Sequence, residues 1–430
     1  MQTILRGIAE KSARQTEHRF QNLINLLTVG FLMYCWRFLN KRSAPGVDGV
    51  DAKHYCQNLK QNVEDLIGRV KRGGYRAKLI LRRFIPKSGG KFRPLGIPAI
   101  EDKLLQTAVT KILEAIFDPI FLACSFGYRP KVGALDAVKA LSRTLQFNGY
   151  HYIVEADIRS FFDNIRHDKL MEMISRKIDD RLFLRLIWKW LNAGVLENGK
   201  VINPVGGTPQ GGIISPILAN IYLHYALDVW FEDVVKTHIR GAAYLCRYAD
   251  DFVCAFQFQD DADWFYAALG SRLEEFGLSL ASEKTRIIRF SRLHLKDKSY
   301  FEFLGFEFRW TLSRTGRPQV KRRTSRKNLR DSRKRVYNWC RENRGMKISK
   351  LLWKLRDKLR GYYNYYGVIG NYKSLMAFYY YAIRSLFKWM NRRSQRRSYT
   401  WEGFLELLKC HGIPMPRITE KRPAPQLRFQ

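Results

Sequence analysis

The sequence is short of acidic residues, of paired cysteines and of long apolar runs. Its 430 residues include 76 Lys and Arg against 39 Asp and Glu, a net charge of +37. So large a positive charge predicts a polyanionic partner. The seven cysteines are scattered and never form a C-x-x-C pair, which argues against a zinc ribbon or a disulfide framework and favours a reducing compartment. The most apolar early run, 23–36, is too short to span a bilayer.

The sequence is rich in apolar residues, and its positive charge is concentrated in the last quarter. Hydrophobic residues make up 46% and aromatic residues 14% of the chain, which is enough for the cores of two or three domains. From 321 to 430 there are 29 Lys and Arg against 6 Asp and Glu, a net of +23. A single basic run fits a solvated surface, but here basic residues alternate with Tyr, Trp and Phe. The last quarter is therefore predicted to bind nucleic acid beside a less basic catalytic body.

Two adjacent carboxylates, Asp250 and Asp251, lie between the apolar runs 243–246 and 252–256. This pattern predicts a β-hairpin with an acidic tip. Neighbouring like charges repel, so a hard divalent cation is their natural partner. A second apolar strand ends at Asp157, and bringing it to the pair would create a two-metal site for phosphoryl or nucleotidyl transfer. A four-residue match alone also fits a polar turn.

The surrounding periodicity predicts a mixed α and β chain. The segments between 151 and 290 follow the order strand, helices, hairpin, helix, strand, which is the split βαβ pattern of a ferredoxin-like layer. The expected elements are a basic hairpin at 79–98, helices at 101–117 and 167–193, a glycine-rich loop at 206–212 leading into a helix at 213–230, a helix at 262–276 and a strand at 286–290.

Seven motifs, in this order, resemble the group II intron-encoded reverse transcriptase/maturase family over nearly the whole chain. They are Gly46-Val47-Asp48-Gly49, the block from Ile85 to Pro98, Ser125 to Pro130, Asp157 with Phe161-Phe162-Asp163, Gly207 to Gly212, Arg247 to Asp251, and Phe303-Leu304-Gly305-Phe306. The resemblance implies an α+β fold of right-hand polymerase architecture. Helical and hairpin fingers would span 1–150, a ferredoxin-like palm 151–312 and an α-helical thumb or maturase domain 313–430.

The resemblance implies an RNA-directed DNA polymerase that uses two Mg²⁺ ions, with Mn²⁺ as a substitute. Asp157, Asp250 and Asp251 would be the catalytic metal ligands, together with the backbone carbonyl of Ile158. One ion would lower the pKa of the primer 3′-hydroxyl, and the other would neutralise the triphosphate.

Further residues would bind the incoming nucleotide. By analogy with the family, Lys87 and Arg93 on the hairpin would grip the triphosphate, where positive charge offsets what develops in the transition state. Gln210 would touch the nascent base pair or sugar, its flanking glycines allowing close backbone approach.

Roles for the residues that follow the two strands remain open. One of Phe161 and Phe162 would exclude the ribose 2′-hydroxyl while the other is core, and the sequence does not say which. Lys284 is a candidate proton donor to pyrophosphate, although a surface lysine is equally expected there. Asp163 fits a helix cap better than a third metal ligand.

Expected partners are intron RNA, an RNA template with its DNA primer, dNTPs and target DNA, with no membrane. The cluster Arg392, Arg393, Arg396 and Arg397 is expected to contact the RNA backbone rather than only solvent. Many members of that family carry a C-terminal DNA-endonuclease domain with paired C-x-x-C and His or Asn ligands, whereas the only cysteine and histidine near the end of this chain are Cys410 and His411. An endonuclease-lacking member is therefore expected, in the bacterial cytoplasm or nucleoid.

Two alternatives remain. One is a maturase that binds intron RNA and has a dispensable polymerase site. The other is a host-serving reverse transcriptase of the retron, diversity-generating or defence type. The loop at 207–212 and the aromatic, basic C-terminal region favour the intron-encoded form.

Overall fold

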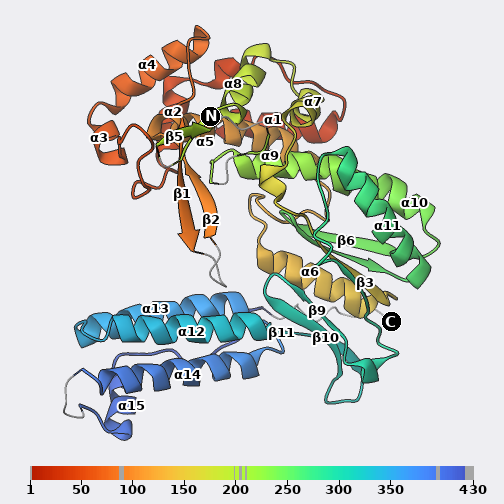
Figure 1. Ribbon diagram of the computed structural model, residues 1–430, viewed down its shortest axis with the longest axis vertical. Coiled ribbons are helices and arrows are strands. Elements are labelled where there is room, and N and C mark those ends of the chain that lie inside the picture. Colours follow the sequence, from red (N-terminus) through yellow and green to blue (C-terminus); the bar gives the residue numbers. More distant parts are fainter. Residues whose placement is uncertain are drawn as a thin grey trace. The chain divides into compact units, whose positions relative to one another are not determined.

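The computed structural model describes residues 2–86, 92–197, 199–202, 206–208, 211–393 and 398–421. The chain divides into two compact units: unit 1 is Met1–Ala137 with Tyr152–Ile287, and unit 2 is Val138–His151 with Ile288–Gln430. Both contain helices and strands (Figure 1), so the expected α+β class is confirmed. The three-part division into 1–150, 151–312 and 313–430 stays a prediction.

The N-terminal part of unit 1 is built around one buried helix, α5 (Ile100–Phe117). Nearly all of its side chains are buried, including the polar Gln106, as expected of a helix that is covered on all sides. Helices α1 and α2 pack against it, and Ser12 donates a hydrogen bond to the carbonyl of Ile116 at 2.6 Å. The other helical elements before residue 150 are α1 (Gln2–Arg14), η1 (Leu23–Leu26), α2 (Val29–Trp36), α3 (Ala52–Gln57), α4 (Leu59–Lys71), η2 (Asp118–Ile120) and α6 (Ala134–Phe147).

The expected basic hairpin is present and belongs to a small sheet with strand order β2-β1-β4-β5. Its strands are antiparallel, with Ile85 opposite Arg93, and β1 runs parallel to β4. The four strands are β1 (Ile80–Pro86), β2 (Phe92–Ile97), β4 (Val195–Glu197) and β5 (Lys200–Ile202). Lys87, expected at the turn of the hairpin, lies outside the described residues.

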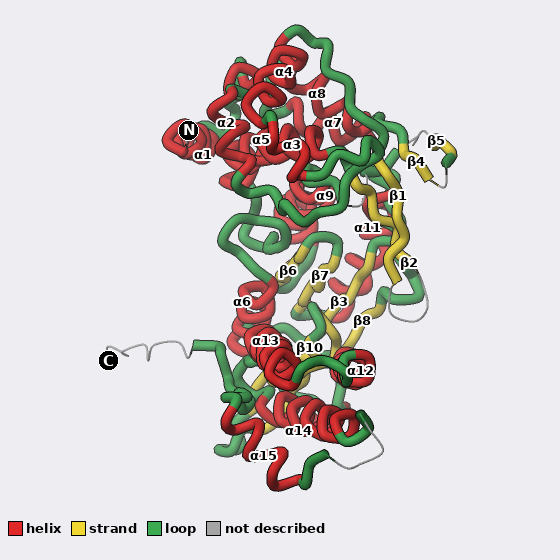
Figure 2. The backbone as a smooth tube through the Cα atoms, turned by 90° about the vertical axis from the view of Figure 1, so that its left-hand side faces the viewer, coloured by secondary structure: helices red, strands yellow, loops and turns green. Residues whose placement is uncertain are grey.

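A second sheet carries the carboxylates and has strand order β6-β7-β3-β8. Strand β7 is antiparallel to both β6 and β3, and helix α11 (Gln259–Glu275) packs on β3 and β7. The expected split βαβ pattern is therefore observed (Figure 2). The strands are β3 (Tyr152–Asp157), β6 (Ala243–Tyr248), β7 (Asp251–Phe256) and β8 (Arg286–Arg289).

Two predicted helices are interrupted. The segment 167–193 forms two helices, α7 (His167–Ser175) and α8 (Arg181–Leu191), because Asp180 caps α8 by accepting a hydrogen bond from the backbone N–H of Phe183. The segment predicted to be helical at 213–230 is helical from Ser215 onward, but beyond α9 (Ser215–Leu223) it contains two π-helical turns, η4 (His224–Asp228) and η5 (Phe231–Val235), before the short α10 (Lys236–His238). Such π-turns are frequent at functional sites.

Unit 2 joins a three-stranded sheet, in the order β11-β10-β9, to a group of helices. The helices bury an apolar core that includes Leu355, Leu359, Leu375 and Leu386. The elements are η6 (Leu295–Asp297), β9 (Tyr300–Phe303), β10 (Phe306–Leu312), β11 (Pro318–Thr324), α12 (Arg326–Glu342), α13 (Ile348–Tyr366), α14 (Tyr372–Met390) and α15 (Trp401–Cys410). No helix within the described ranges of the chain is long and apolar enough to cross a membrane.

Candidate active site

The three expected carboxylates lie at the same end of the sheet that contains β3 and β7. Asp157 ends β3 and lies directly opposite Asp251, the first residue of β7. Directly opposed residues in an antiparallel pair point to the same face, with Cβ atoms about 4.5–5.5 Å apart. Asp250 lies in the two-residue turn between β6 and β7. Burial raises the pKa of Asp250, and the negative charge of Asp157 raises it further.

The turn that holds Asp250 has an unusual backbone. Ala249 has φ 57°, in the left-handed region that costs energy for residues other than glycine. A Cβ added to Gly127 would lie 2.3 Å from the backbone nitrogen of Ala249. The loop 125–128 therefore packs backbone to backbone against the turn, and this explains why a glycine stands at 127.

The carboxylates offer hard oxygen donors of the kind that Mg²⁺ prefers. The ammonium group of Lys284 contacts the Asp157 carboxylate and so places a positive charge there. This hydrogen bond raises the pKa of Lys284. Among the described residues, however, no group of three or more His, Cys, Asp and Glu side chains is close enough to hold a metal ion. The fit to a metal thus rests on Asp157 and Asp250, with Asp251 opposite Asp157.

Ile158 follows Asp157 and is buried at 3% exposure. It forms an isolated antiparallel bridge with Leu280, and the carbonyl of Asp157 accepts a hydrogen bond from the N–H of Ala281 at 2.8 Å. The segment 279–281 thus fixes the backbone from which the Ile158 carbonyl would ligate a metal.

The hairpin brings Arg93 near the acidic turn. Its positive charge acts on Asp250 and on Tyr128. Burial raises the pKa of the Tyr128 hydroxyl, and the charge of Asp250 raises it further. The sequence alone did not predict a role for Tyr128, because only the fold brings the loop 125–128 next to the turn that holds Asp250. Lys87 and Gln210 lie outside the described residues, so their roles stay predictions.

Phe161 and Phe162 are both buried, at 2% and 7% exposure. Their ring centroids are 5.3 Å apart, and Phe161 also packs against Tyr222. They begin a 3₁₀ turn, η3 (Phe161–Asp163), which starts four positions after Asp157. The expectation that Asp163 caps a helix is wrong, because it is the last residue of this turn and is exposed.

The glycine-rich loop is anchored to that turn. The N–H of Thr208 donates to the carbonyl of Phe162 at 2.7 Å. Gly207 has φ +86°, and a Cβ there would lie 2.8 Å from the carbonyl oxygen of Asp163. Glycine is required at 207 both for the backbone angle and for this close approach.

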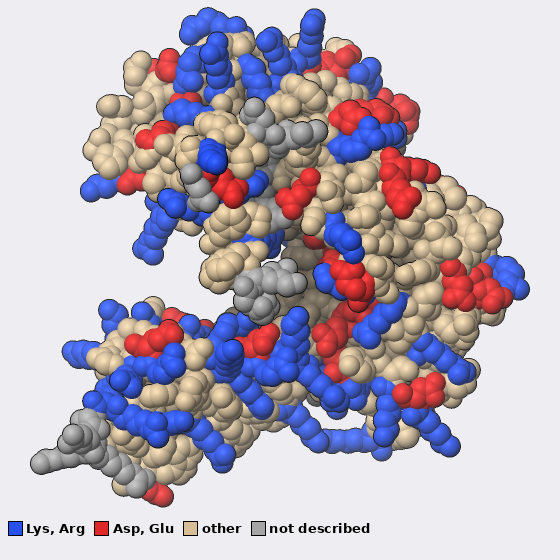
Figure 3. Space-filling view, in the orientation of Figure 1, with Lys and Arg blue, Asp and Glu red and all other residues tan. Residues whose placement is uncertain are grey.

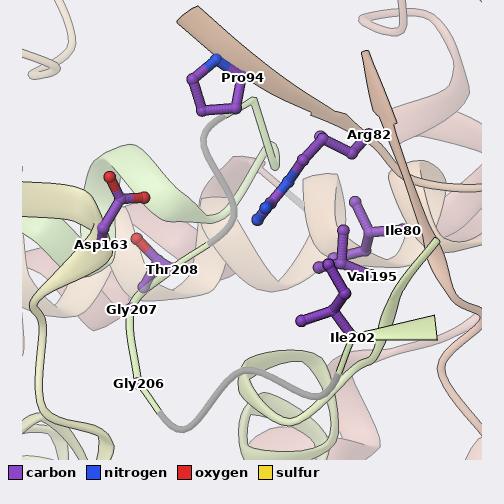
Figure 4. A pocket seen from close by; sticks show the side chains of 10 residues that line it. Ile80, Arg82, Pro94, Asp163, Val195, Ile202, Gly206, Gly207 and Thr208 are labelled. Atoms are coloured by element: carbon purple, nitrogen blue, oxygen red, sulfur yellow. The ribbon is translucent and has the colours of Figure 1, made fainter. Parts of the chain in front are cut away.

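A cavity of about 260 Å³ opens between the small sheet and this loop. Figure 4 shows the guanidinium of Arg82 directed into it from one side, with Asp163 and Thr208 on the other. Arg82 also pairs with Glu197 at 3.0 Å. The hairpin and the glycine-rich loop thus line a common hollow next to η3.

Lys and Arg side chains gather over the helices of unit 2 (Figure 3). Arg392 is exposed beside the ring of Trp389, and Arg393 donates to the carbonyl of Met346 at 3.0 Å. Arg393 also lines an open hollow together with Arg341 and Arg344. The sequence alone did not point to Arg341 and Arg344, because they lie about 50 positions before Arg393 in the chain. Arg396 and Arg397 lie outside the described residues.

Comparisons with known proteins agree with the motifs. A family model described as reverse transcriptase (RNA-dependent DNA polymerase) matches residues 85–308. The group II intron-encoded protein LtrA of Lactococcus lactis subsp. cremoris is 38% identical over 226 residues, which cover 51% of this chain and 37% of LtrA. The protein YkfC of Escherichia coli (strain K12) is 34% identical over 280 residues, 58% of this chain and 74% of YkfC.

A 91 kDa protein in the cob intron of Schizosaccharomyces pombe is 44% identical over 153 residues, 36% of this chain and 19% of that protein. The chain thus matches well under half the length of LtrA and of this relative. The family model covers just over half of the chain and includes Asp157, Asp250 and Asp251. The chain therefore belongs to the reverse transcriptase (RNA-dependent DNA polymerase) family, as its motifs predicted, and it is similar to a group II intron-encoded protein.

Proposed function

We propose that this protein is an RNA-directed DNA polymerase encoded by a group II intron, with maturase activity that assists splicing and mobility of the intron RNA. The observation that carries the proposal is the pairing of Asp157 with Asp251, beside Asp250 in the turn. In the polymerase architecture, 1–150 would form the fingers, 151–312 the palm and 313–430 the thumb. The partners would be intron RNA, the template–primer duplex, dNTPs and target DNA.

The residues of the site suit nucleotidyl transfer. Asp157, Asp250, Asp251 and the carbonyl of Ile158 would hold two Mg²⁺ ions, which supply an activated 3′-hydroxyl and a neutralised triphosphate when bound. Arg93 would offset the charge of the phosphates. Lys284, whose pKa is raised by its hydrogen bond to Asp157, keeps its proton at neutral pH. It would be the proton donor to the leaving pyrophosphate, because its contact with Asp157 holds it beside the carboxylates.

Primer extension tests the proposal directly. The purified chain should extend a DNA primer on an RNA template with dNTPs and Mg²⁺, and excess EDTA should stop the reaction. Tight binding of the template–primer without any extension, in Mg²⁺ and in Mn²⁺, would instead support the alternative of an RNA-binding maturase with a dispensable polymerase site. The observation that favours this alternative is the gathering of Lys and Arg over unit 2.

The choice between an intron-encoded and a host-serving enzyme can be tested in the flanking DNA. An intron-encoded member should lie within an RNA that folds the catalytic domain V hairpin of a group II intron. A retron, diversity-generating or defence locus around the gene would contradict the intron assignment while leaving the polymerase proposal intact.

Replacing the residue that excludes the 2′-hydroxyl should raise the use of rNTPs relative to dNTPs. Phe161→Ala and Phe162→Ala each open a buried site and should cost about 3–5 kcal/mol of stability. Only one of them should change the ratio of rNTP to dNTP incorporation in single-nucleotide extension. Phe183→Ala, in the core face of α8, is the matched control for lost packing. An unchanged ratio in both variants would place the gate elsewhere.

Binding of structured RNA should weaken steeply as salt rises. If about 7 to 9 phosphates are neutralised, the log–log slope should be about −5 to −8. Neutralising Arg392, Arg393, Arg396 and Arg397 together should flatten the slope by about 3 and impair splicing assistance more than extension of a saturating primer–template.

A matched variant removes the same charge from unit 1 at four side chains that already pair with carboxylates: Lys60, Arg176, Lys236 and Arg240. It should leave the slope unchanged. Equal slopes for the two quadruple variants, with splicing intact, would show that the C-terminal cluster is only a solvated surface.

A further inference from the structure

Arg247 lies completely buried beneath the acidic turn, at 0% exposure. An arginine has five N–H donors, and each of them has a partner here. The acceptors are both carboxylate oxygens of Asp228 at 2.7 and 2.5 Å, the side-chain oxygen of Asn220 at 3.1 Å, the hydroxyl of Ser125 at 2.7 Å and the carbonyl of Ala249 at 3.1 Å.

This network is poorly explained by stability alone. Taking two charges out of water is costly, and apolar residues of similar volume often replace a buried ion pair without loss. Yet the side chains of Arg247 and Asp228 are both at 0% exposure. Asp228 ends the π-helical turn η4. The helix thus changes to π-helical geometry at the turn that carries Asp228, the ion-pair partner of Arg247.

The network instead converges on the backbone of the acidic turn. The backbone N–H of Arg247 donates a hydrogen bond to the carbonyl of Cys124 at 2.8 Å. The carbonyl of Arg247 accepts one from the backbone N–H of Phe126 at 2.9 Å. The side chain of Asn220 donates to the carbonyl of Gly127 at 2.6 Å. One guanidinium N–H then reaches the carbonyl of Ala249, the residue in the left-handed region. That carbonyl belongs to the peptide group that leads into Asp250.

We propose that Arg247, held by Asp228 and Asn220, is a positioning residue for nucleotidyl transfer. It fixes the peptide between Ala249 and Asp250 and so aims the Asp250 carboxylate at the metal site. This inference rests on the proposed function, but it adds a requirement that the carboxylates themselves do not impose.

The obvious single variants leave one charge buried and unpaired, which is strongly destabilising. The informative variant replaces both partners, Arg247→Met with Asp228→Leu, and so keeps the buried volume while removing the bond to the Ala249 carbonyl. Arg247→Lys is the second variant, because it keeps a charge opposite Asp228 but has only three donors on one nitrogen and lacks the planar guanidinium fork. Either variant tests the inference if the other fails to fold.

In both variants kcat for extension should fall roughly tenfold or more, and the Mg²⁺ concentration for half-maximal rate should rise. The Kd for primer–template and the KM for dNTP should stay near wild type. Adding Ala249→Gly should restore kcat roughly fivefold, because glycine takes up the left-handed conformation without the cost that alanine bears. If Arg247 served only the stability of the fold, Ala249→Gly would not restore kcat in these variants.

The matched control is a second arginine–carboxylate pair of unit 1, Arg69 with Glu101 at 2.7 Å. Arg69→Met with Glu101→Leu should leave the Mg²⁺ dependence unchanged. Wild-type kcat and Mg²⁺ dependence in the Arg247 variants, or a loss that Ala249→Gly does not relieve, would overturn the inference while the wild type still extends primers. Failure of the wild type to extend at all would count against the proposed function.

Discussion

Asp250→Asn and Asp157→Asn should each reduce Mg²⁺-dependent extension of a DNA primer on an RNA template by about 10³-fold or more. Metal ions contribute several kcal/mol of charge stabilisation to such a transition state, and about 1.4 kcal/mol corresponds to a tenfold change in rate. Binding of RNA should stay near wild type, because it depends on basic side chains. The measurement is single-turnover extension together with filter binding. Full extension by either variant would contradict the metal assignment.

Asp260→Asn is the matched control. Asp260 is an exposed carboxylate that pairs with Arg240 at 2.7 Å, and its variant should extend primers as the wild type does.

Stability distinguishes catalytic loss from unfolding in the Asp250 variant. Burial, and then the charge of Asp157, raise the pKa of Asp250 in the folded protein. Its contribution to the stability of the metal-free fold is therefore present below its unfolded pKa and is lost as pH rises through the raised folded pKa. Without metal, Asp250→Asn should melt no lower than wild type at neutral pH, and any gain should shrink toward acid pH. A lower melting temperature at pH 7 would indicate that activity is lost through unfolding.

Gly127→Ala should cost about 3 kcal/mol of stability and most of the polymerase activity. The added Cβ would lie 2.3 Å from the nitrogen of Ala249 and 2.9 Å from the carbonyl carbon of Tyr248. Both contacts are backbone atoms, so relief requires a shift of the turn that carries Asp250, and overpacking of this kind typically costs 1–3 kcal/mol or more. Denaturant unfolding and primer extension would measure the two effects.

Gly270→Ala, in helix α11, is the matched control. A Cβ at 270 meets no atom within 4 Å, and alanine is favoured over glycine inside a helix by about 0.5–1 kcal/mol. This variant should gain stability and keep full extension activity. Wild-type stability and activity in Gly127→Ala would show that the loop 125–128 does not pack against the turn.

The sequence predicts the acidic hairpin well because local signals agree there. Two apolar runs flank Asp250 and Asp251, and the strand at 152–157 pairs with the second run so that Asp157 lies opposite Asp251. The break between α7 and α8 escaped prediction, because the apolar periodicity continues across it. What ends the pattern is Asp180, whose carboxylate also accepts a hydrogen bond from the N–H of Ile24, 156 positions away.

The hydrogen bonds of Arg247 beneath the acidic turn could not be predicted either, because they too depend on residues far away in the sequence. Arg247 is adjacent to the acidic motif in sequence, but its partners Asn220 and Ser125 lie 27 and 122 positions away. A basic residue before a hairpin tip is ordinarily expected on the surface. Only the completed fold shows that the guanidinium is buried and bonded to the carbonyl of Ala249.

Counting bound metal ions shows whether Asp157 and Asp250 hold two ions. Mn²⁺ would be titrated into the chain with a template–primer that ends in a dideoxynucleotide and the next matched dNTP, and the bound ions would be counted by electron paramagnetic resonance. We expect two Mn²⁺ per wild-type complex and fewer in Asp250→Asn and in Asp157→Asn, with Asp260→Asn equal to wild type. The same number of bound ions in wild type and in both catalytic variants would contradict this expectation.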